Sequence, residues 1–312
     1  MKSKTLNYFI AALLIAPYLK AADDNDTISL KVIKEIVSTD IMGCSSFVFS
    51  PDNDNYLLAS STGFNRAYVV DIEKERIIKV EMNDYLGVAW FGENILLLKK
   101  DNIWEIKGID KKRNIICDKM KISPFDRIEG VRSSISINNM NYIPNDVVVL
   151  QNYDDINIYI NEDGQTRIKS NLYKNTFPIV QDQQMYLSPD KVKLLLCHES
   201  KVLDLYTGRE YKLPQDDKNR WKQYYWLPNS VDLIAVGYKL HDKYEGPINS
   251  ELYLYNIFAT EIIKVEIPSK MKNTVIGIKD ISKRGRIAAL IQEGYPSEKP
   301  ISLNIFELKF NN

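Results

Sequence analysis

Residues 185–213, MYLSPDKVKLLLCHESKVLDLYTGREYKL, carry the clearest structural pattern in the 312-residue chain. Three apolar runs are separated by the turn sequence SPD (188–190) and by a polar loop. The turn sequence YTG (206–208) then leads into a fourth run. Short apolar runs bounded by Pro, Asp and Gly are typical of β-strands joined by tight turns. This stretch therefore predicts four successive antiparallel strands.

The same unit recurs along the chain. Its first copy spans residues 47–80, with SPD (50–52) after the first apolar run and EKE (73–75) before the fourth. The turn that follows the first run can be aligned six times, at Pro51, Gly92, Pro144, Pro189, Pro228 and Lys283. The intervals average about 46 residues, near the 40–50-residue period of four-stranded propeller blades. Six such units fill residues 23–312, which we predict to be one domain.

The two ends of the chain complement each other. The sixth unit has only three predicted strands and ends with residues 301–308, whereas residues 28–37 form a strand-like run that no neighbouring unit uses. Pairing these two runs would satisfy backbone groups that an open outer edge leaves unpaired. The sequence thus predicts an all-β, six-bladed β-propeller of four-stranded antiparallel blades, closed by the N-terminal strand joining the last blade. A β-sandwich with irregular spacing is the alternative.

Two motifs resemble those of known propellers. SPD at 50–52 and 188–190, and VLDLYTG at 202–208, are similar to the turn signatures of TolB-like and WD-repeat-like β-propellers. The resemblance covers residues 45–308 as a pattern and is strongest in the first and fourth units. The smaller α/β domain that precedes the propeller in TolB proteins has no counterpart here, so TolB partners are not carried over. The resemblance implies an exported, rigid binding platform.

The first 22 residues have the order of a secretory signal peptide. Lys2 and Lys4 precede an apolar run at residues 6–19, and Ala21 and Ala22 follow it. The run is shorter than the roughly 18 residues that a membrane-spanning helix needs. We therefore predict a signal peptide over residues 1–22, a periplasmic or secreted mature chain, and no membrane span after cleavage. An uncleaved anchor is the alternative.

Composition excludes several classes of protein. The chain has 41 basic and 41 acidic residues and is 45% hydrophobic, so it is neither disordered nor basic enough to indicate a nucleic-acid partner. Its three cysteines, Cys44, Cys117 and Cys197, fall in separate units. Cysteines on different blades rarely approach closely enough for a disulfide, so we expect small buried side chains instead.

No catalytic motif is present, and we predict no catalytic residue, metal site or cofactor. His198 and His241 are the only histidines, and a nucleophilic device needs a base that a third group orients. The acidic stretches at 52–55 and 161–164 lack the distal Glu of a calcium loop and fit hairpin turns. A metal-dependent propeller enzyme of the lactonase, lyase or hydrolase type is the alternative, but only scattered acids such as Asp182 and Asp280 could serve its central channel.

Large aromatic side chains and long loops suggest where such a chain could bind. Trp90 and the run YYW (224–226) lie in first strands, where we expect them to pack between blades. Three long loops, at 60–66, 239–250 and 292–300, should form one sector, since the fifth, sixth and first units are neighbours in a ring. With their flanks they supply the predicted binding residues Phe64, Asn65, Arg66, Tyr238, His241, Tyr244, Glu245, Tyr295 and Glu298. Tolerated polar insertions are the alternative. The sequence favours a non-catalytic module that binds another protein or a polymer.

Overall fold

The protein is built almost entirely of β-strands. The computed structural model describes residues 27–61, 66–82, 85–91, 94–99, 104–107, 117–120, 131–133, 141–143, 147–153, 156–160, 166–170, 176–178, 185–190, 192–197, 199–213, 221–240, 247–259, 262–293 and 301–311. Within these ranges the helices are a single short α-helix, α2 (Thr39–Met42), and a 3-10 turn, η1 (Ser269–Met271). The all-β prediction is confirmed.

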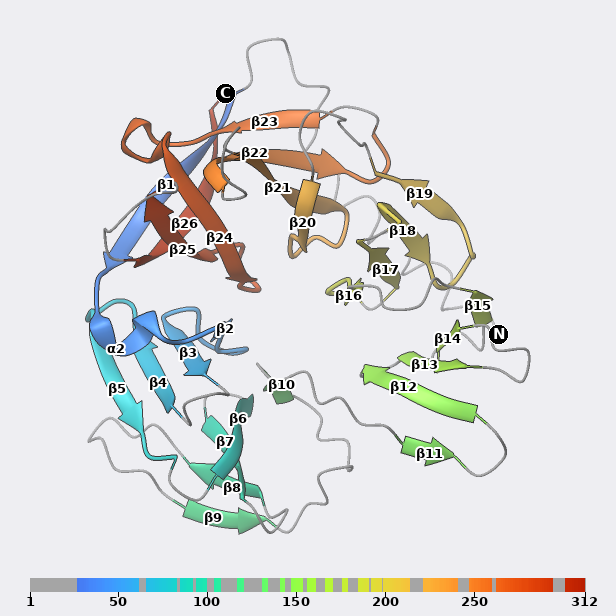
Figure 1. Ribbon diagram of the computed structural model, residues 1–312, viewed down its shortest axis with the longest axis horizontal. Coiled ribbons are helices and arrows are strands. Elements are labelled where there is room, and N and C mark those ends of the chain that lie inside the picture. Colours follow the sequence, from blue (N-terminus) through green and yellow to red (C-terminus); the bar gives the residue numbers. More distant parts are fainter. Residues whose placement is uncertain are drawn as a thin grey trace, which may run out of the picture.

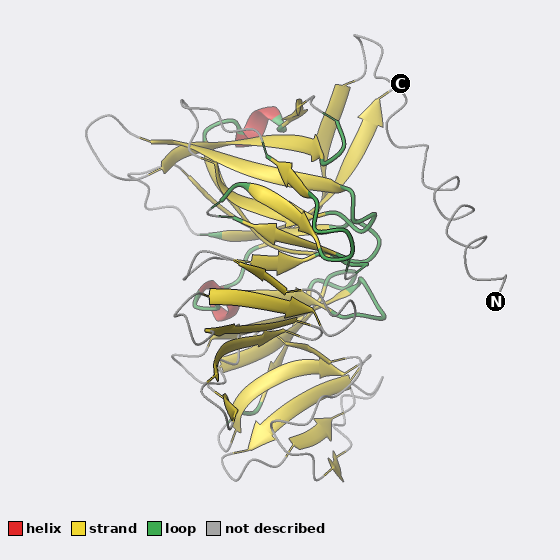
Figure 2. Ribbon diagram, turned by 90° about the vertical axis from the view of Figure 1, so that its right-hand side faces the viewer, coloured by secondary structure: helices red, strands yellow, loops and turns green. Residues whose placement is uncertain are grey.

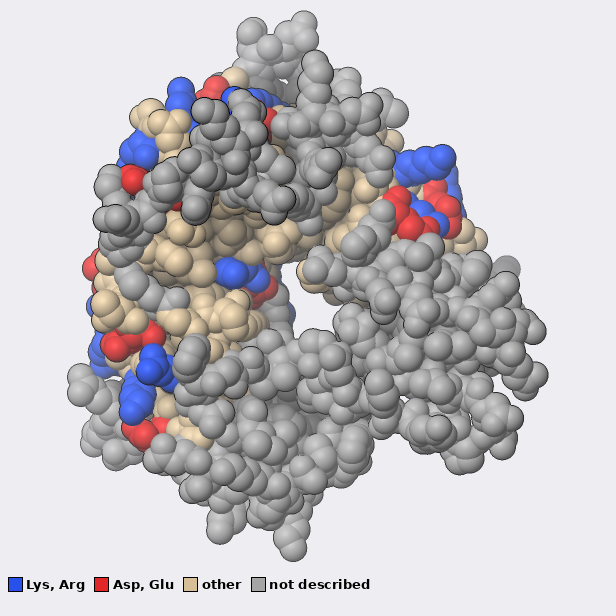
Figure 3. Space-filling view, viewed as in Figure 1, with Lys and Arg blue, Asp and Glu red and all other residues tan. Residues whose placement is uncertain are grey.

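The strands form five sheets that follow one another around a common centre (Figure 1), and the space-filling view shows a hollow there (Figure 3). One four-stranded sheet has the order β2 (Ser46–Phe49), β3 (Tyr56–Ser61), β4 (Arg66–Asp71), β5 (Arg76–Val80). The other has the order β16 (Met185–Leu187), β17 (Lys193–Leu196), β18 (Lys201–Asp204), β19 (Glu210–Lys212). In the side view of Figure 2 the strands run from one face of the molecule toward the other.

Two sheets have five strands and one has eight. The first five-stranded sheet has the order β10 (Val131–Ser133), β6 (Tyr85–Phe91), β7 (Asn94–Lys99), β8 (Trp104–Lys107), β9 (Cys117–Met120). The second has the order β11 (Asn141–Ile143), β12 (Val147–Tyr153), β13 (Ile156–Ile160), β14 (Thr166–Ser170), β15 (Thr176–Pro178). The eight-stranded order is β20 (Trp221–Trp226), β21 (Asp232–Leu240), β22 (Pro247–Asn256), β23 (Ile262–Glu266), β1 (Thr27–Ile36), β26 (Ser302–Asn311), β25 (Ile287–Glu293), β24 (Thr274–Ile281).

The predicted closure of the chain ends is confirmed. β1 pairs antiparallel with β26, with Leu30 opposite Leu308 and Ile36 opposite Leu303. The register shifts between Val32 and Lys34, where the pair contains a bulge or similar irregularity. The first and last described strands therefore hydrogen-bond to each other, as the surplus strand at one end and the missing strand at the other required.

One pairing departs from the expected set of separate antiparallel blades. β1 also pairs with β23, in parallel, through Ile28 opposite Val265 and Ser29 opposite Glu266. This pairing joins two groups of four strands into the single eight-stranded sheet. The prediction of purely antiparallel, separate blades is wrong here, because the N-terminal end of β1 satisfies backbone groups of an outer strand that would otherwise remain an open edge.

The predicted turns lie where two antiparallel strands meet. Each of the six aligned positions falls between paired strands, namely β2 and β3, β6 and β7, β11 and β12, β16 and β17, β20 and β21, and β24 and β25. Middle strands are buried along their whole length, as in β17, whereas the outer strand β23 alternates between exposed and partly buried positions until Val265. This difference follows because middle strands pack on both faces.

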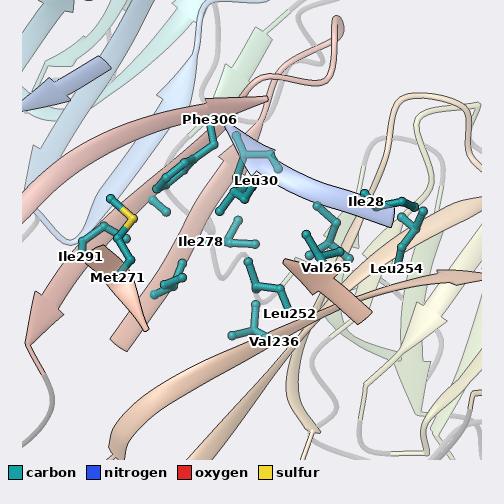
Figure 4. Close-up of a cluster of buried hydrophobic side chains, with 14 of the residues drawn as sticks. Ile28, Leu30, Val236, Leu252, Leu254, Val265, Met271, Ile278, Ile291 and Phe306 are labelled. Carbon is teal, nitrogen blue, oxygen red and sulfur yellow. The ribbon is translucent and has the colours of Figure 1, made fainter. Parts of the chain in front are cut away.

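Hydrophobic side chains fill the spaces between neighbouring groups of strands. The largest described cluster joins β1 and β20–β26 and includes Leu30, Leu252, Val265 and Phe306 (Figure 4). Trp90 is fully buried in a second cluster, and its Nε1–H donates to the Val48 carbonyl at 2.8 Å. The predicted packing of first-strand aromatics between units is confirmed.

The same contact recurs elsewhere in the ring. The Nε1–H of Trp226 in β20 donates to the Tyr186 carbonyl in β16 at 3.0 Å, across 40 positions of the chain. The Trp90 Nε1–H likewise donates to the carbonyl of a residue 42 positions earlier, Val48. Buried indole N–H groups need an acceptor, and here each finds it on the first strand of another unit. These bonds fix the first strands of two pairs of units against each other.

Two of the cysteines are free thiols, and the predicted burial is confirmed for Cys44. Cys44 is buried, Cys197 is half-buried, and both are free thiols. Burial raises the pKa of Cys44 to about 11 and that of Cys197 to about 12. Only the backbone of Cys117 belongs to the described structure, so its predicted burial stays a prediction. The predicted signal peptide lies outside the described residues, and none of the helices described is long and apolar enough to cross a membrane.

Candidate functional site

Most of the predicted loop sector lies outside the described residues. This is true of Phe64, Asn65, His241, Tyr244, Glu245, Tyr295 and Glu298. Arg66 is the exposed first residue of β4, and Tyr238 is half-buried in β21. β21 continues through Leu240 and β22 begins at Pro247, so the loop between them is shorter than the sequence indicated. The sector remains a prediction.

Tyr238 belongs to a polar cluster between β20, β21 and β24. Its hydroxyl donates to Gln223 Oε1 at 3.0 Å. The hydroxyl of Tyr225 lies 2.8 Å from the same oxygen and 2.7 Å from the Ile278 carbonyl oxygen. Burial raises the pKa of both phenols. These tyrosines are therefore neutral hydrogen-bonding groups that hold β20 and β21 against β24.

An exposed aromatic surface lies on another part of the molecule. It consists of Arg209, Tyr211 and Phe258, which contact one another in sequence, and of Tyr206, which lies on the same turn as Arg209, and we call it the aromatic surface. Tyr206 is 68% exposed and Phe258 is 60% exposed. The rings of Tyr211 and Phe258 meet edge to face, with centroids 5.3 Å apart. The Arg209 guanidinium lies 5.0 Å from the Tyr211 centroid, within cation–π range.

Local sequence fixes both turns that carry this surface. In the turn between β18 and β19, Asp204 Oδ1 accepts from the backbone N–H groups of Tyr206 and Thr207 at 2.9 and 2.8 Å. Gly208 adopts a left-handed conformation (φ 75°), which glycine tolerates without strain. After β22, Asn256 Oδ1 accepts from the Phe258 N–H at 2.9 Å. Such side-chain-to-backbone bonds favour turns over continued strands.

The two turns are also held to each other. The Tyr255 hydroxyl on β22 donates to the Lys212 carbonyl on β19 at 3.1 Å. Nearby, Ser230 Oγ accepts from the Asp190 N–H at 2.9 Å. The aromatic surface therefore spans two groups of strands whose relative position is fixed by hydrogen bonds, and a partner would meet it without reordering the backbone.

The aromatic surface lies at the opposite ends of the strands from those that the predicted loops join. Successive turns of an antiparallel unit alternate between the two faces, so the first and third turns share one face and the second turn lies on the other. The aromatic surface uses third turns, whereas the predicted sector uses second turns. Sequence reasoning missed it, although a signal was present: the third turns of two consecutive units, YTG (206–208) and NIF (256–258), each carry an aromatic residue.

The described residues contain no group of three or more His, Cys, Asp or Glu that could hold a metal ion. Asp280, a candidate acid for the central channel, is instead used structurally, because its Oδ2 accepts from the Phe49 N–H at 2.7 Å. Asp182, His198 and His241 lie outside the described residues. The acidic turn at 52–55 is a hairpin turn, as predicted, in which Asp54 is buried against Ser282.

Comparison with known proteins gives a likeness of fold. No protein-family model matches the sequence, and no curated protein does. The RRP9 WD40 repeats match at 10% identity and a TM-score of 0.47, over 90% of this chain and 100% of that one. The WD40 β-propeller domain of Doa1 matches at 13% identity and a TM-score of 0.45, over 90% of this chain and 97% of that one. The C-terminal WD40 domain of Sif2 matches at 10% identity and a TM-score of 0.45, over 91% and 99%. The chain is thus similar to WD40 β-propeller domains, while its architecture is established by its own strand order and ring closure.

Proposed function

We propose that this chain is an exported six-bladed β-propeller that binds another protein through the aromatic surface. The observation that carries the proposal is the fixed arrangement of Arg209, Tyr211 and Phe258, with Tyr206 more exposed than any other large apolar residue described. Tyr and Arg are enriched among the residues that dominate binding energy at protein interfaces. Large exposed apolar groups that gather on one rigid surface mark interaction sites.

Six blades account for the strand order. β2–β5 and β16–β19 each supply one blade, and each five-stranded sheet supplies a blade with one added strand. The eight-stranded sheet supplies two: β20–β23 form one, and β24–β26 with β1 form the other. The regular interval of the six predicted turns supports this count. A propeller closed in this way is a stiff support for turns on its faces.

Export rests on the predicted signal peptide over residues 1–22. Strand β1 begins at Thr27, so cleavage after Ala22 would leave the whole of the ring-closing strand in the mature chain. N-terminal sequencing of the protein from its own cell envelope and culture medium tests this part. A mature chain that begins near residue 23 supports it, and a chain that begins at Met1 contradicts it.

Binding is tested by paired substitutions on the aromatic surface. We expect Tyr206→Ala combined with Phe258→Ala to reduce recovery of a cross-linked partner from native cells at least tenfold, because truncating a dominant interface residue costs 2 kcal/mol or more. Val37→Ala is the matched control, since Val37 is 61% exposed and lies outside the surface. Unchanged melting temperatures show that both variants fold. Equal recovery for the double variant and the control would reject the aromatic surface as a binding site.

The predicted loop sector is a second candidate for the binding face. Grouped alanine substitutions at Phe64, Tyr244 and Tyr295, assayed by the same cross-linking, separate the two faces. Loss of the partner in the loop variant with normal recovery in the aromatic-surface variant would assign binding to the opposite face.

A further inference from the structure

A strongly basic hairpin lies between β24 and β25. Residues 279–286 contain four basic side chains, Lys279, Lys283, Arg284 and Arg286. The first three are exposed and form no ion pair with any residue that the structure describes. Arg286 is different, because its Nε lies 3.4 Å from Glu307 Oε1 and its Nη1 donates to Asn55 Oδ1 at 2.8 Å. We call Lys279, Lys283 and Arg284 the basic hairpin.

The backbone of this hairpin is fixed. Ser282 Oγ accepts from the N–H groups of Arg284 and Arg286 at 3.2 and 3.0 Å. The same hydroxyl donates to the buried Asp54 Oδ2 on the β2–β3 turn at 2.7 Å. Gly285 takes the left-handed conformation (φ 85°) that closes the turn. The three cations therefore project from a support that two groups of strands hold in place, rather than from a free loop.

None of the acids that the structure describes forms an ion pair with these cations. The carboxylate of Asp54 accepts from Ser282, and that of Asp280 accepts from the Phe49 N–H. Asp52 on the neighbouring turn is exposed and forms no ion pair with the hairpin. The chain as a whole has equal numbers of acidic and basic residues, so the excess of positive charge here is local.

Lys279 occupies an irregular position in β24. The pairing of β24 with β25 shifts between Ile278 and Asp280, which leaves Lys279 as the unpaired residue of a bulge. Bulges re-aim a side chain and are over-represented beside functional sites. Partial withdrawal from water lowers the pKa of the Lys279 ammonium, and no described counter-ion offsets this effect. Figure 3 shows a basic patch, with acidic atoms beside it, at the rim of the central hollow.

We propose that the basic hairpin binds an acidic segment of the partner protein, rich in Asp or Glu. The proposal rests on the proposed function as a protein-binding platform and names the chemistry of the partner. The hairpin joins first and second strands, so it lies on the same face as the aromatic surface. Lysine and arginine at fixed spacing pair with carboxylates, and such complementarity sets partner choice and the rate of association.

Three cations suit a short acidic segment better than a nucleic acid or a membrane surface. Nucleic-acid binding typically uses six to ten phosphate contacts, and membrane-binding clusters contain four to eight basic residues. The hairpin offers three cations that form no ion pair within the described ranges, on a chain with no net charge. A few carboxylates on a peptide match this number.

The test uses the purified mature protein and a fluorescein-labelled peptide that contains six consecutive glutamates. Fluorescence anisotropy gives its dissociation constant, with the hexaglutamine peptide as the neutral probe. We expect the triple variant Lys279→Gln, Lys283→Gln, Arg284→Gln to raise the dissociation constant about tenfold, since exposed ion pairs are individually weak and the effects of three of them add. The matched control replaces three exposed lysines elsewhere, Lys239→Gln, Lys272→Gln and Lys309→Gln, with the same change in net charge.

The outcomes separate this proposal from its alternatives. Weaker binding by the triple variant alone, together with weaker binding of the wild type at 200 mM than at 50 mM salt, supports it. Equal losses in both triple variants would show a nonspecific charge effect and overturn it, as would equal binding of hexaglutamine. Tighter binding to phosphatidylserine vesicles or to an oligonucleotide of equal charge would assign the hairpin to a membrane or a nucleic acid instead. The double variant of the aromatic surface keeps the basic hairpin, so failure of the cross-linking test and failure of this test are distinguishable.

Discussion

Replacing Leu30 with alanine tests the closure of the ring. Leu30 is 3% exposed and packs in the cluster that joins β1 to β20–β26. The substitution removes three carbon groups, and at about 0.8 kcal/mol for each, the lost transfer free energy is about 2.4 kcal/mol. The cavity left behind adds to this value, so we expect the free energy of unfolding to fall by about 2–5 kcal/mol. For a chain of this size the melting temperature should fall by roughly 4–10 °C.

The assay compares Leu30→Ala with Lys31→Ala in the same strand. Lys31 is exposed, so its substitution should change the free energy of unfolding by less than about 0.5 kcal/mol. Urea unfolding followed by tryptophan fluorescence gives both values, and native-state hydrogen exchange should show the amides of β1 as protected as those of β26. If Leu30→Ala were no more destabilising than Lys31→Ala, β1 would not close the ring.

Two further predictions concern buried groups. Asp54→Ala should lower the free energy of unfolding in urea by about 1–3 kcal/mol, because Ser282 loses its buried acceptor. Asp52→Ala, on the exposed side of the same turn, should lower it by less than about 0.5 kcal/mol. Equal effects of the two substitutions would contradict the role of this bond. Desolvation raises the pKa of Cys44 to about 11, more than the nearby Arg66 lowers it. At pH 8 only about 0.1% of this thiol is ionised, against about a quarter of a free thiol of pKa 8.5. Alkylation of Cys44 by iodoacetamide, followed by peptide mass spectrometry, should therefore be at least a hundredfold slower in the folded protein than in urea. Because the unfolded thiol ionises first, stability should fall as pH rises from about 9 to about 11; rapid alkylation at pH 8 would show that the thiol is accessible and ionised.

The repeat could be predicted because each of its signals is local. A turn such as SPD (188–190) needs only neighbouring residues: Ser188 Oγ accepts from the Lys193 N–H at 2.9 Å, and Asp190 Oδ1 accepts from the Val192 N–H at 3.1 Å. Side chains of this kind favour a turn wherever they occur. Their spacing then predicts how many units follow one another. The burial of Trp90 and Trp226 could also be predicted, because a large aromatic side chain in a first strand fits the space between neighbouring units.

The aromatic surface could not be predicted in the same way. Tyr211 and Phe258 are separated by about one whole unit of the chain, and their contact depends on how two neighbouring groups of strands are rotated against each other. The Tyr255–Lys212 hydrogen bond fixes that rotation. The predicted binding residues were chosen from the longest loops, and the length of a loop reflects tolerance of insertions as much as function.

Local chemistry in the sequence determined the strands, their turns, their repeat and the need for the two chain ends to pair. Tertiary structure alone decided which groups meet between units: the parallel pairing of β1 with β23, and the contact of Phe258 with Tyr211, over whose ring Arg209 lies. The physical reason is distance along the chain. Turns and strand patterns are set by interactions over a few residues, whereas these contacts join segments that are far apart in the chain and meet only when units pack against each other.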